Sequence, residues 1–283
     1  MRWTCNLLII VGVMLMYTDT YSDDLKVDAE SCQFDYSDYT SLLADYVDDD
    51  GMVNYKALKA NRSRLDSFAD RMEKLDSEGY EKWPEKERIA FWLNAYNALT
   101  LKAIIDNYPI KSSFLKSRIY PKNSIRQIPG VWDKITFNIM GTPHTLEHIE
   151  HQILRKKFNE PRIHMAMVCA AMGCPPLLNQ HYSGAKLDRQ LDDRTKRFLE
   201  NPDKFKIDRD KNTVYLSSIL RWFAEDFMEK YAPEKNVAKH DKKTSAVLNF
   251  IAPYLNQPDK DYTLKGSFKI KYVKYDWSLN EQK

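Results

Sequence analysis

The sequence lacks the features that mark several large classes of protein. Its 43 basic and 40 acidic side chains leave a formal net charge of only +3, whereas a nucleic-acid-binding surface needs Lys and Arg clustered on one face. The Lys-rich stretch at 239–243 contains an acidic residue and reads as solvated surface. The G-x-S-x-G motif of serine hydrolases, the phosphate-binding P-loop and the dinucleotide-binding fingerprint are also absent. The composition therefore predicts no nucleic-acid partner and no nucleotide cofactor.

Long apolar runs are missing as well. The most apolar internal stretch, residues 91–105, carries two Asn and a Lys, so no stable membrane span is expected there. Residues 7–16 form a short apolar run after Arg2, and small polar residues precede Asp23. This is the pattern of a secretory signal peptide, and the run is too short for a bilayer that needs ~20 residues. We predict a signal peptide at 1–22, a polar lead-in at 23–36 and a secreted or periplasmic protein that begins near Asp23. An uncleaved N-terminal anchor is the alternative.

Cysteine is scarce, with four in the chain. Cys5 falls within the predicted signal peptide, so export leaves Cys32, Cys169 and Cys174. An odd number of cysteines in an oxidising compartment means that at least one thiol is free or paired between molecules.

The remaining chain has the composition of a packed domain, with 43% hydrophobic residues and 12% aromatic residues. Apolar spacing and capping residues predict helices at 37–46, about 56–75, 84–107, 145–158, 186–200, 221–230 and 244–255. Alternating runs around turn residues predict hairpins at 135–145 and 205–216, and a half-exposed strand at 268–275. No internal repeat, flexible linker or regular alternation of strand and helix is present. We predict an α+β fold, predominantly helical with small antiparallel hairpins, in a single domain over 37–283.

Two asparagines stand out in the most apolar helix. Asn94 and Asn97 are three residues apart and share one side of the predicted helix at 84–107. A buried amide costs ~1–3 kcal/mol if it is left unpaired, so both need partners. Either they tie neighbouring loops to the helix, or they face a cleft and orient a substrate or a catalytic side chain.

The segment TPHTLEHIEHQILR, residues 142–155, is rich in histidine. With Thr145 as the N-cap, Glu147 and His151 lie one helical turn apart, and a carboxylate so placed can set the tautomer of an imidazole. His148 and His151 with a carboxylate would also suit zinc, although the spacing departs from the H-E-x-x-H motif of zinc proteases. Surface roles, acid–base catalysis and metal binding therefore all remain open here. We predict no bound metal or other cofactor.

The segment PRIHMAMVCAAMGCPPL, residues 161–177, places a histidine and a cysteine in an apolar run. Cys174 differs from the others, because Gly173 permits a sharp turn before it and Pro175 holds its backbone extended. Such a thiol would be rigid and partly exposed, as a nucleophile requires. Cys169 should instead be buried and inert. The alternative is a disulfide, either between Cys169 and Cys174 or from one of them to Cys32.

Several of these segments together resemble an uncharacterised family, domain of unknown function 547. They are residues 91–104, 145–155 and 162–177, the segment YDWSLN at 275–280 and, at the start, DGMVNY at 50–55. The resemblance covers about Tyr39 to Asn280 and implies no established activity. It draws attention to the matching motif positions Asn94, Asn97, Glu150, His151, His164, Cys169, Cys174 and Asp276. The family usually has Ser where this chain has Gly173, so a hydroxyl role at that position is not supported.

Three functions fit these residues. The first is a thiol-dependent hydrolase or acyltransferase acting on amide or ester bonds. Its predicted roles are Cys174 as nucleophile, His151 or His164 as base, Glu150 as the group that orients the base, and Asn94 or Asn97 as oxyanion donor. The second is a non-catalytic binding domain with structural cysteines and histidines. The third is a metal site at His148, His151 and a carboxylate. In each case the substrate or partner outside the cytoplasm is unidentified.

Overall fold

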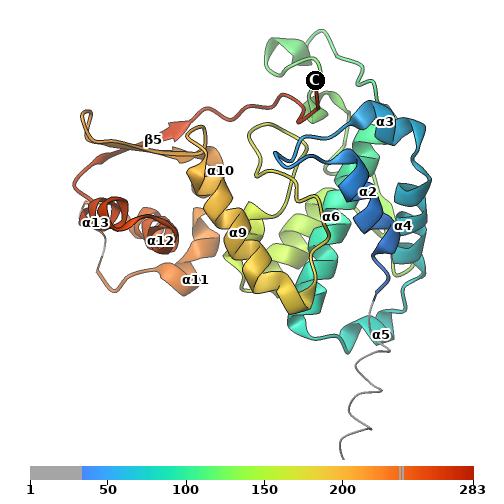
Figure 1. Cartoon of the computed structure of the whole chain (residues 1–283), viewed down its shortest axis with the longest axis horizontal. Helices are drawn as coiled ribbons and strands as arrows, with labels where there is room; N and C mark the ends of the chain where they lie inside the picture. Colours follow the sequence, from blue (N-terminus) through green and yellow to red (C-terminus); the bar gives the residue numbers. More distant parts are fainter. Residues whose placement is uncertain (1–33, 236, 238) are drawn as a thin grey trace, which may run out of the picture. The chain divides into compact units, whose positions relative to one another are not determined.

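The computed structural model describes residues 34–235, 237 and 239–283, and Asp35–Lys283 form one compact unit (Figure 1). The signal peptide predicted at 1–22 and most of the lead-in predicted at 23–36 lie outside the described residues. None of the helices in the described part of the chain combines the length and apolar character needed to cross a bilayer.

Helices account for most of the regular structure, as predicted. The α-helices are α2 (Ser37–Tyr46), α3 (Tyr55–Ala60), α4 (Ser63–Lys74), α5 (Ser77–Glu81), α6 (Glu85–Asn107), α7 (Leu146–His148), α8 (Arg155–Lys157), α9 (Leu187–Glu200), α10 (Ser218–Trp222), α11 (Met228–Tyr231), α12 (Lys242–Ile251) and α13 (Gln257–Lys265). Short 3-10 turns are η1 (Lys116–Arg118), η2 (Ile125–Gln127), η4 (Pro161–Met165), η5 (Gly184–Lys186), η6 (Ala224–Phe227) and η7 (Ala252–Tyr254), and η3 (Ile149–Leu154) is a π-helix.

The strands form two small sheets, which confirms the α+β class. Strands β1 (Phe137–Ile139) and β2 (Thr142–His144) make the first predicted hairpin. Strands β3 (Phe205–Asp208) and β4 (Thr213–Ser217) make the second, with Phe205 opposite Leu216. Strand β5 (Lys269–Val273) lies in the predicted half-exposed segment and pairs in parallel with β4.

Several expectations about helices need correction. The helix predicted over 221–230 begins earlier, at Ser218, and is divided into α10, η6 and α11, and the short helix α5 was not predicted. The helix predicted over 56–75 is two helices, α3 and α4, separated by a turn at Asn61 and Arg62. Helix α13 was not predicted, because Thr263 is the one residue along it that is buried, so an apolar stripe is absent.

Helix α6 is the central element of one half of the core. It is buried on nearly every side and packs against α3, α4, η3 and η5. It ends at Asn107, as predicted, while Pro84 stands just before its first residue. In Figure 1, α2, α3 and α4 lie beside α6, whereas α11, α12, α13 and β5 lie at the other side of the view.

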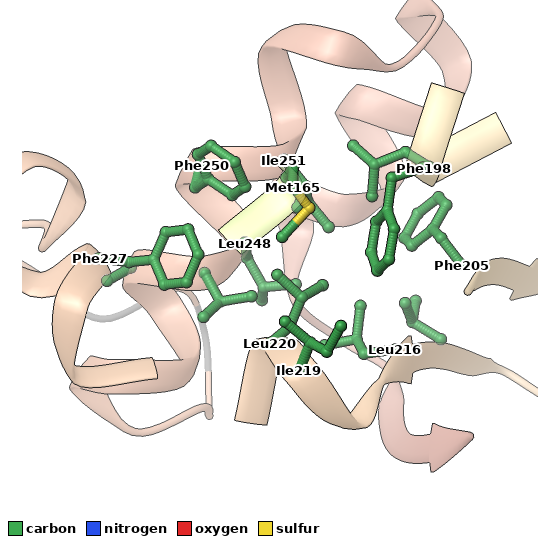
Figure 2. Packing of buried hydrophobic residues seen from close by; sticks show 14 of the residues in the cluster. Met165, Phe198, Phe205, Leu216, Ile219, Leu220, Phe227, Leu248, Phe250 and Ile251 are labelled. Atoms are coloured by element: carbon green, nitrogen blue, oxygen red, sulfur yellow. The ribbon is translucent and has the colours of Figure 1, made fainter. Parts of the chain in front are cut away.

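A second apolar cluster joins α9, the three-stranded sheet, α10 and α12. Figure 2 shows its aromatic side chains, with Phe198 close to Phe205 and Phe227 on the side of Phe250. Met165, whose sulfur is yellow in Figure 2, lies among them and is fully buried. Because Met165 directly follows His164, this cluster anchors the segment that carries the histidine.

Candidate functional site

A cavity of about 560 Å³ brings together residues from segments that are distant in the sequence. Its lining includes Glu150, His151, His164, Cys169 and Cys174. Aromatic side chains from other elements complete the wall, namely Tyr96, Trp132, Trp222, Phe223, Tyr275 and Trp277. Thus His151, His164, Cys169 and Cys174 line one space, whereas His148 is not part of its wall.

The two cysteines of the cavity are joined by a disulfide. Cys174 is therefore not a free thiol in this structure, and one of the two pairings left open by the sequence is present. The exposure expected for the two residues is also reversed, since Cys174 is 4% exposed while Cys169 is only partly buried. The backbone N–H of Cys169 donates to Cys174 Sγ at 3.0 Å. The tight loop between them holds both sulfurs at the cavity wall.

Tyr275 contacts both sulfurs of the disulfide. Its hydroxyl oxygen lies 3.1 Å from Cys169 Sγ and 3.0 Å from Cys174 Sγ, and disulfide sulfurs carry no hydrogen, so the hydroxyl donates. Burial and the charge of Glu150 raise the pKa of Tyr275, which keeps this donor protonated at neutral pH. A Cβ on Gly173 would approach the Tyr275 ring to 2.7 Å. The missing side chain at position 173 therefore makes room for Tyr275 against the cysteines.

Glu150 is presented by an unusual turn of helix. It lies in the π-helix η3, a form that occurs mostly as short insertions and frequently at functional sites. The hydroxyl of Tyr96 on α6 donates to Glu150 Oε2 at 2.9 Å. Burial, together with the Glu150 carboxylate, raises the pKa of Tyr96, so it too remains a donor. The predicted partnership between Glu150 and a histidine is replaced by one with a tyrosine.

The two histidines are linked by an ionic network that the sequence did not reveal. His164 Nε2 lies 2.7 Å from Asp226 Oδ2. Arg155 donates through Nε and Nη2 to the two oxygens of Asp226, at 2.6 and 2.9 Å. Its remaining nitrogen, Nη1, lies 2.7 Å from His151 Nδ1. Because a guanidinium can only donate, Nδ1 of His151 must accept, and the ring proton of neutral His151 is on Nε2. His151, which lines the cavity, thereby keeps Nε2–H as its ring donor.

Burial determines the protonation of the other histidine. His164 is 2% exposed and stacks on Phe223, with ring centroids 4.1 Å apart. Burial lowers the pKa of His164, and the Asp226 carboxylate opposes this only in part. For Asp226, burial would raise the pKa, but the hydrogen bonds from His164 and Arg155 outweigh it and hold the pKa below its usual range. The pair is therefore a neutral imidazole that donates to an ionised carboxylate.

Asn94 and Asn97 are buried but are not among the residues that line the cavity. Asn97 accepts from Val168 N at 2.8 Å and donates to Ala166 O at 3.0 Å. Asn94 binds both backbone groups of Tyr182 in the same way, with both distances 2.8 Å. Both side-chain amides are hydrogen-bonded to backbone groups, so the predicted role of oxyanion donor is not supported. The alternative interpretation, that they tie loops to the helix, describes both, and α6 reaches the cavity through Tyr96 instead.

The metal hypothesis finds no support in the positions of the side chains. His148 is exposed and packs edge-on against His144, with centroids 4.9 Å apart. Across the residues the structure describes, no three His, Cys, Asp or Glu side chains come together as metal ligands would.

The motifs near the two ends of the described chain meet beside the cysteine loop. Gly173 N donates to Asp276 O at 2.7 Å, and Met172 N donates to Ser278 O at 2.8 Å. Asn280 accepts from the Tyr55 hydroxyl at 2.7 Å. Asp276 acts through its backbone, while its side chain accepts from the N–H of Ser278. These contacts hold the loop between the cysteines and also bring Tyr275 to the sulfurs.

Lys204 also contacts the loop between the cysteines. Its burial should make the stability of the protein depend on pH. It is 5% exposed, donates to Met172 O, and burial lowers its pKa to about 8. The unfolded chain binds this proton more tightly than the folded one, so stability should rise with pH above the folded value. Between about pH 7.5 and about pH 9.5 we expect the wild type to gain about 2 kcal/mol in unfolding free energy relative to Lys204→Met. Urea unfolding at several pH values measures this.

The exposed neighbour Lys206 on β3 offers a matched control, because Lys206→Met removes a lysine from the same region without opening a buried site. If the unfolding free energies of the wild type and Lys204→Met change with pH in parallel, Lys204 is solvated and not buried.

Four residues of the candidate site could not be assigned from the sequence: Tyr96, Arg155, Asp226 and Tyr275. Two of them had local signals, since Arg155 stands one helical turn after His151 and Tyr275 opens the YDWSLN segment. Tyr96 lies in the most apolar helix of the sequence, where an aromatic residue indicates a core position. Asp226 lies 62 residues from His164 and had no local signal at all.

The comparison with protein families agrees with the resemblance noted in the sequence. Residues 80–199 match the family described as "Protein of unknown function, DUF547". This range contains the segments of α6, the histidine-rich helix and both cysteines, while 50–55 and 275–280 lie outside it. No curated protein and no solved structure matches the chain.

Proposed function

The chain carries a DUF547 domain over residues 80–199, and we propose that its cavity is the active site of a thiol-dependent hydrolase or acyltransferase for amide or ester bonds. The observation that carries the proposal is the meeting of Cys169, Cys174, Glu150 and His151 in one cavity of about 560 Å³. The disulfide is the resting form, and a dithiol reductant generates the reactive one.

Cys174 is the nucleophile of the proposal. Its sulfur receives two hydrogen bonds, from Cys169 N–H and the Tyr275 hydroxyl, at 3.0 Å each. Donors to a sulfur stabilise the thiolate and lower the pKa of the thiol. Cys169 Sγ receives the Tyr275 contact alone among the bonds described. Once reduced, Cys174 is therefore the better thiolate.

The other groups of the cavity take roles that follow from their contacts. Glu150 accepts the thiol proton, because its carboxylate lines the same cavity as Cys174 and its charge acts on Tyr275, whose hydroxyl contacts the Cys174 sulfur. The thiolate then attacks the carbonyl carbon, and the π electron pair moves onto oxygen, where Nε2–H of His151 donates. Collapse breaks the bond to the leaving alcohol or amine, which takes the proton from Glu150. Water then hydrolyses the thioester and restores the thiol.

The runner-up is a non-catalytic binding domain, and the disulfide between Cys169 and Cys174 favours it. In that case the cavity binds a ligand through its aromatic walls, and the disulfide only stabilises the loop between the cysteines. Both functions are compatible with an exported protein. We propose export because residues 1–22 have the pattern of a signal peptide and because disulfides persist in oxidising compartments.

Reduction of the full-length protein separates the two functions. After treatment with a phosphine reductant, we expect iodoacetamide to label Cys174 faster than free cysteine near neutral pH, as peptide mapping would measure. With p-nitrophenyl acetate we expect an acylation burst followed by turnover. Cys174→Ser should lower the turnover by at least about 100-fold, because it removes the nucleophile.

Cys169→Ser is the matched control. It leaves Cys174 unpaired, so activity should appear without the reductant, and its unfolding midpoint shows whether the fold survives. Equal turnover by the reduced wild type and Cys174→Ser, or labelling of Cys174 slower than that of free cysteine, would favour the binding domain.

A further inference from the structure

The segment between α6 and β1 exposes large apolar side chains. Phe114, Leu115 and Ile119 are 76%, 70% and 76% exposed. No other large hydrophobic side chain in the described part of the chain exceeds the 45% of Trp222. We call residues 111–122 the basic–apolar loop. In Figure 1 this green segment lies at the top of the view, near the C-terminal residues.

The charge of this region is as unusual as its exposure. Between Asp106 and Asp133 the sequence contains five Lys or Arg residues and no Asp or Glu. The chain as a whole is nearly balanced, with 43 basic and 40 acidic side chains, so the excess is local. Within the loop, Arg118 lies over the Phe114 ring, 5.0 Å from its centroid. The cationic and apolar side chains therefore form one mixed surface.

The loop keeps its shape through a buried polar side chain. Gln127, 2% exposed, accepts from Ser113 N at 3.0 Å and donates to Pro121 O at 3.0 Å. Lys116 adds a bond to Arg126 O at 3.0 Å. These bonds fold the loop across its base while the three apolar side chains stay outside. Because the loop is ordered while these side chains are exposed to water, it is preorganised to bind a surface that buries them.

We propose that the basic–apolar loop docks the protein onto the surface of an anionic lipid bilayer. Phe114, Leu115 and Ile119 enter the boundary between headgroups and acyl chains. Lys111, Arg118 and Lys122 then meet the headgroup phosphates. Segments that lie at a membrane interface combine apolar side chains with Lys and Arg in this way. The core of a protein–protein interface is instead depleted in Lys, which argues against a protein as the occupant.

Docking would also place the cavity beside the membrane. Arg126, which follows the loop, lines the cavity and lies over the rings of Tyr120 and Trp277 at 4.8 and 5.0 Å. Arg126 thus connects the cavity wall to Tyr120 of the loop. The docking proposal does not depend on catalysis, since it rests on the exposure and charge of the loop alone.

Vesicle co-sedimentation of the full-length protein tests the proposal. We expect the wild type to bind vesicles of phosphatidylcholine mixed with phosphatidylglycerol and to bind pure phosphatidylcholine far more weakly. The triple variant Lys111→Glu, Arg118→Glu and Lys122→Glu should lose about 100-fold or more in affinity. The triple variant Phe114→Ser, Leu115→Ser and Ile119→Ser should lose at least about tenfold, because it removes the inserted side chains.

A matched charge control is available on the exposed face near β5. Lys269→Glu, Lys271→Glu and Lys274→Glu change the net charge equally and should bind mixed vesicles almost as well as the wild type. Equal loss in both charge variants would reduce the effect to net charge and overturn the proposal. So would a wild type that leaves mixed vesicles unbound at low salt, in which case an acidic protein partner would fit the loop better. Thermal unfolding midpoints verify that each exposed substitution leaves the fold intact.

Discussion

Replacement of Asn97 by alanine is expected to destabilise the protein by about 3 kcal/mol. The substitution removes one hydrogen bond to Ala166 O and one to Val168 N, both in the buried interior, and leaves two backbone groups unpaired. It also loosens the segment that leads to Cys169. We expect a dithiol to reduce the disulfide about tenfold faster. This factor corresponds to a loss of about 1.4 kcal/mol in the free energy that holds the segment before Cys169 in place. Urea unfolding and the rate of reduction measure the two effects.

Asn94→Ala is the matched control for this prediction. Asn94 makes the same pair of bonds to the backbone of Tyr182, so a similar loss of stability is expected. Tyr182 is not among the residues that line the cavity, and the rate of disulfide reduction should remain at the wild-type value. If both variants speed reduction equally, the effect comes from global destabilisation and not from the segment that Asn97 holds.

Asp226→Asn is expected to cost about 3 kcal/mol, because it leaves the partly buried Arg155 without its counter-charge. The stabilisation that Asp226 provides has a defined pH dependence. The pKa of Asp226 is depressed in the folded state, so its contribution is complete above the unfolded value near ~3.9 and is lost as pH falls through the folded value. The difference in unfolding free energy between wild type and variant should therefore shrink in acid.

Asp188→Asn tests whether burial is the cause. Asp188 also pairs with an arginine, Arg162, but its side chain is 53% exposed. Exposed ion pairs contribute about 0–1 kcal/mol, so this variant should unfold close to the wild type. Comparable losses for the two variants would mean that the Asp226 network is no more than another surface pair.

The sequence predicted the elements whose signals are local. Helix α6 combines a proline at its start with an asparagine at its end, and the two hairpins have turn residues between alternating runs. Helix α13 did carry local signals, with Asn256 as N-cap, a proline in the first turn and Gly266 in the left-handed conformation at its end. Without an apolar face, those signals were not sufficient.

The residues of the candidate site also divide into those with a local signal in the sequence and those without one. Glu150, His151, His164, Cys169 and Cys174 come from two short segments. Residue type drew attention to the histidines and cysteines, and the family resemblance drew attention to Glu150. Their partners could not be identified in this way, because pairing depends on the fold. Tyr96 meets Glu150 across 54 residues of sequence and Asp226 meets His164 across 62. Local patterns predicted which side chains have chemistry to offer, whereas tertiary packing determined which of them donate and which accept.

The contact between Tyr275 and Cys174 has a consequence for biosynthesis. The two residues are 101 positions apart, and a ribosome adds roughly 5–20 residues per second. For roughly 5–20 s, then, each nascent chain presents the cysteines of the loop before the tyrosine and the flanking backbone that hold them have been made. During that interval the pairing of Cys169 with Cys174, instead of with the earlier Cys32, depends on their closeness in the chain and on contacts with elements already made, such as those of Asn97.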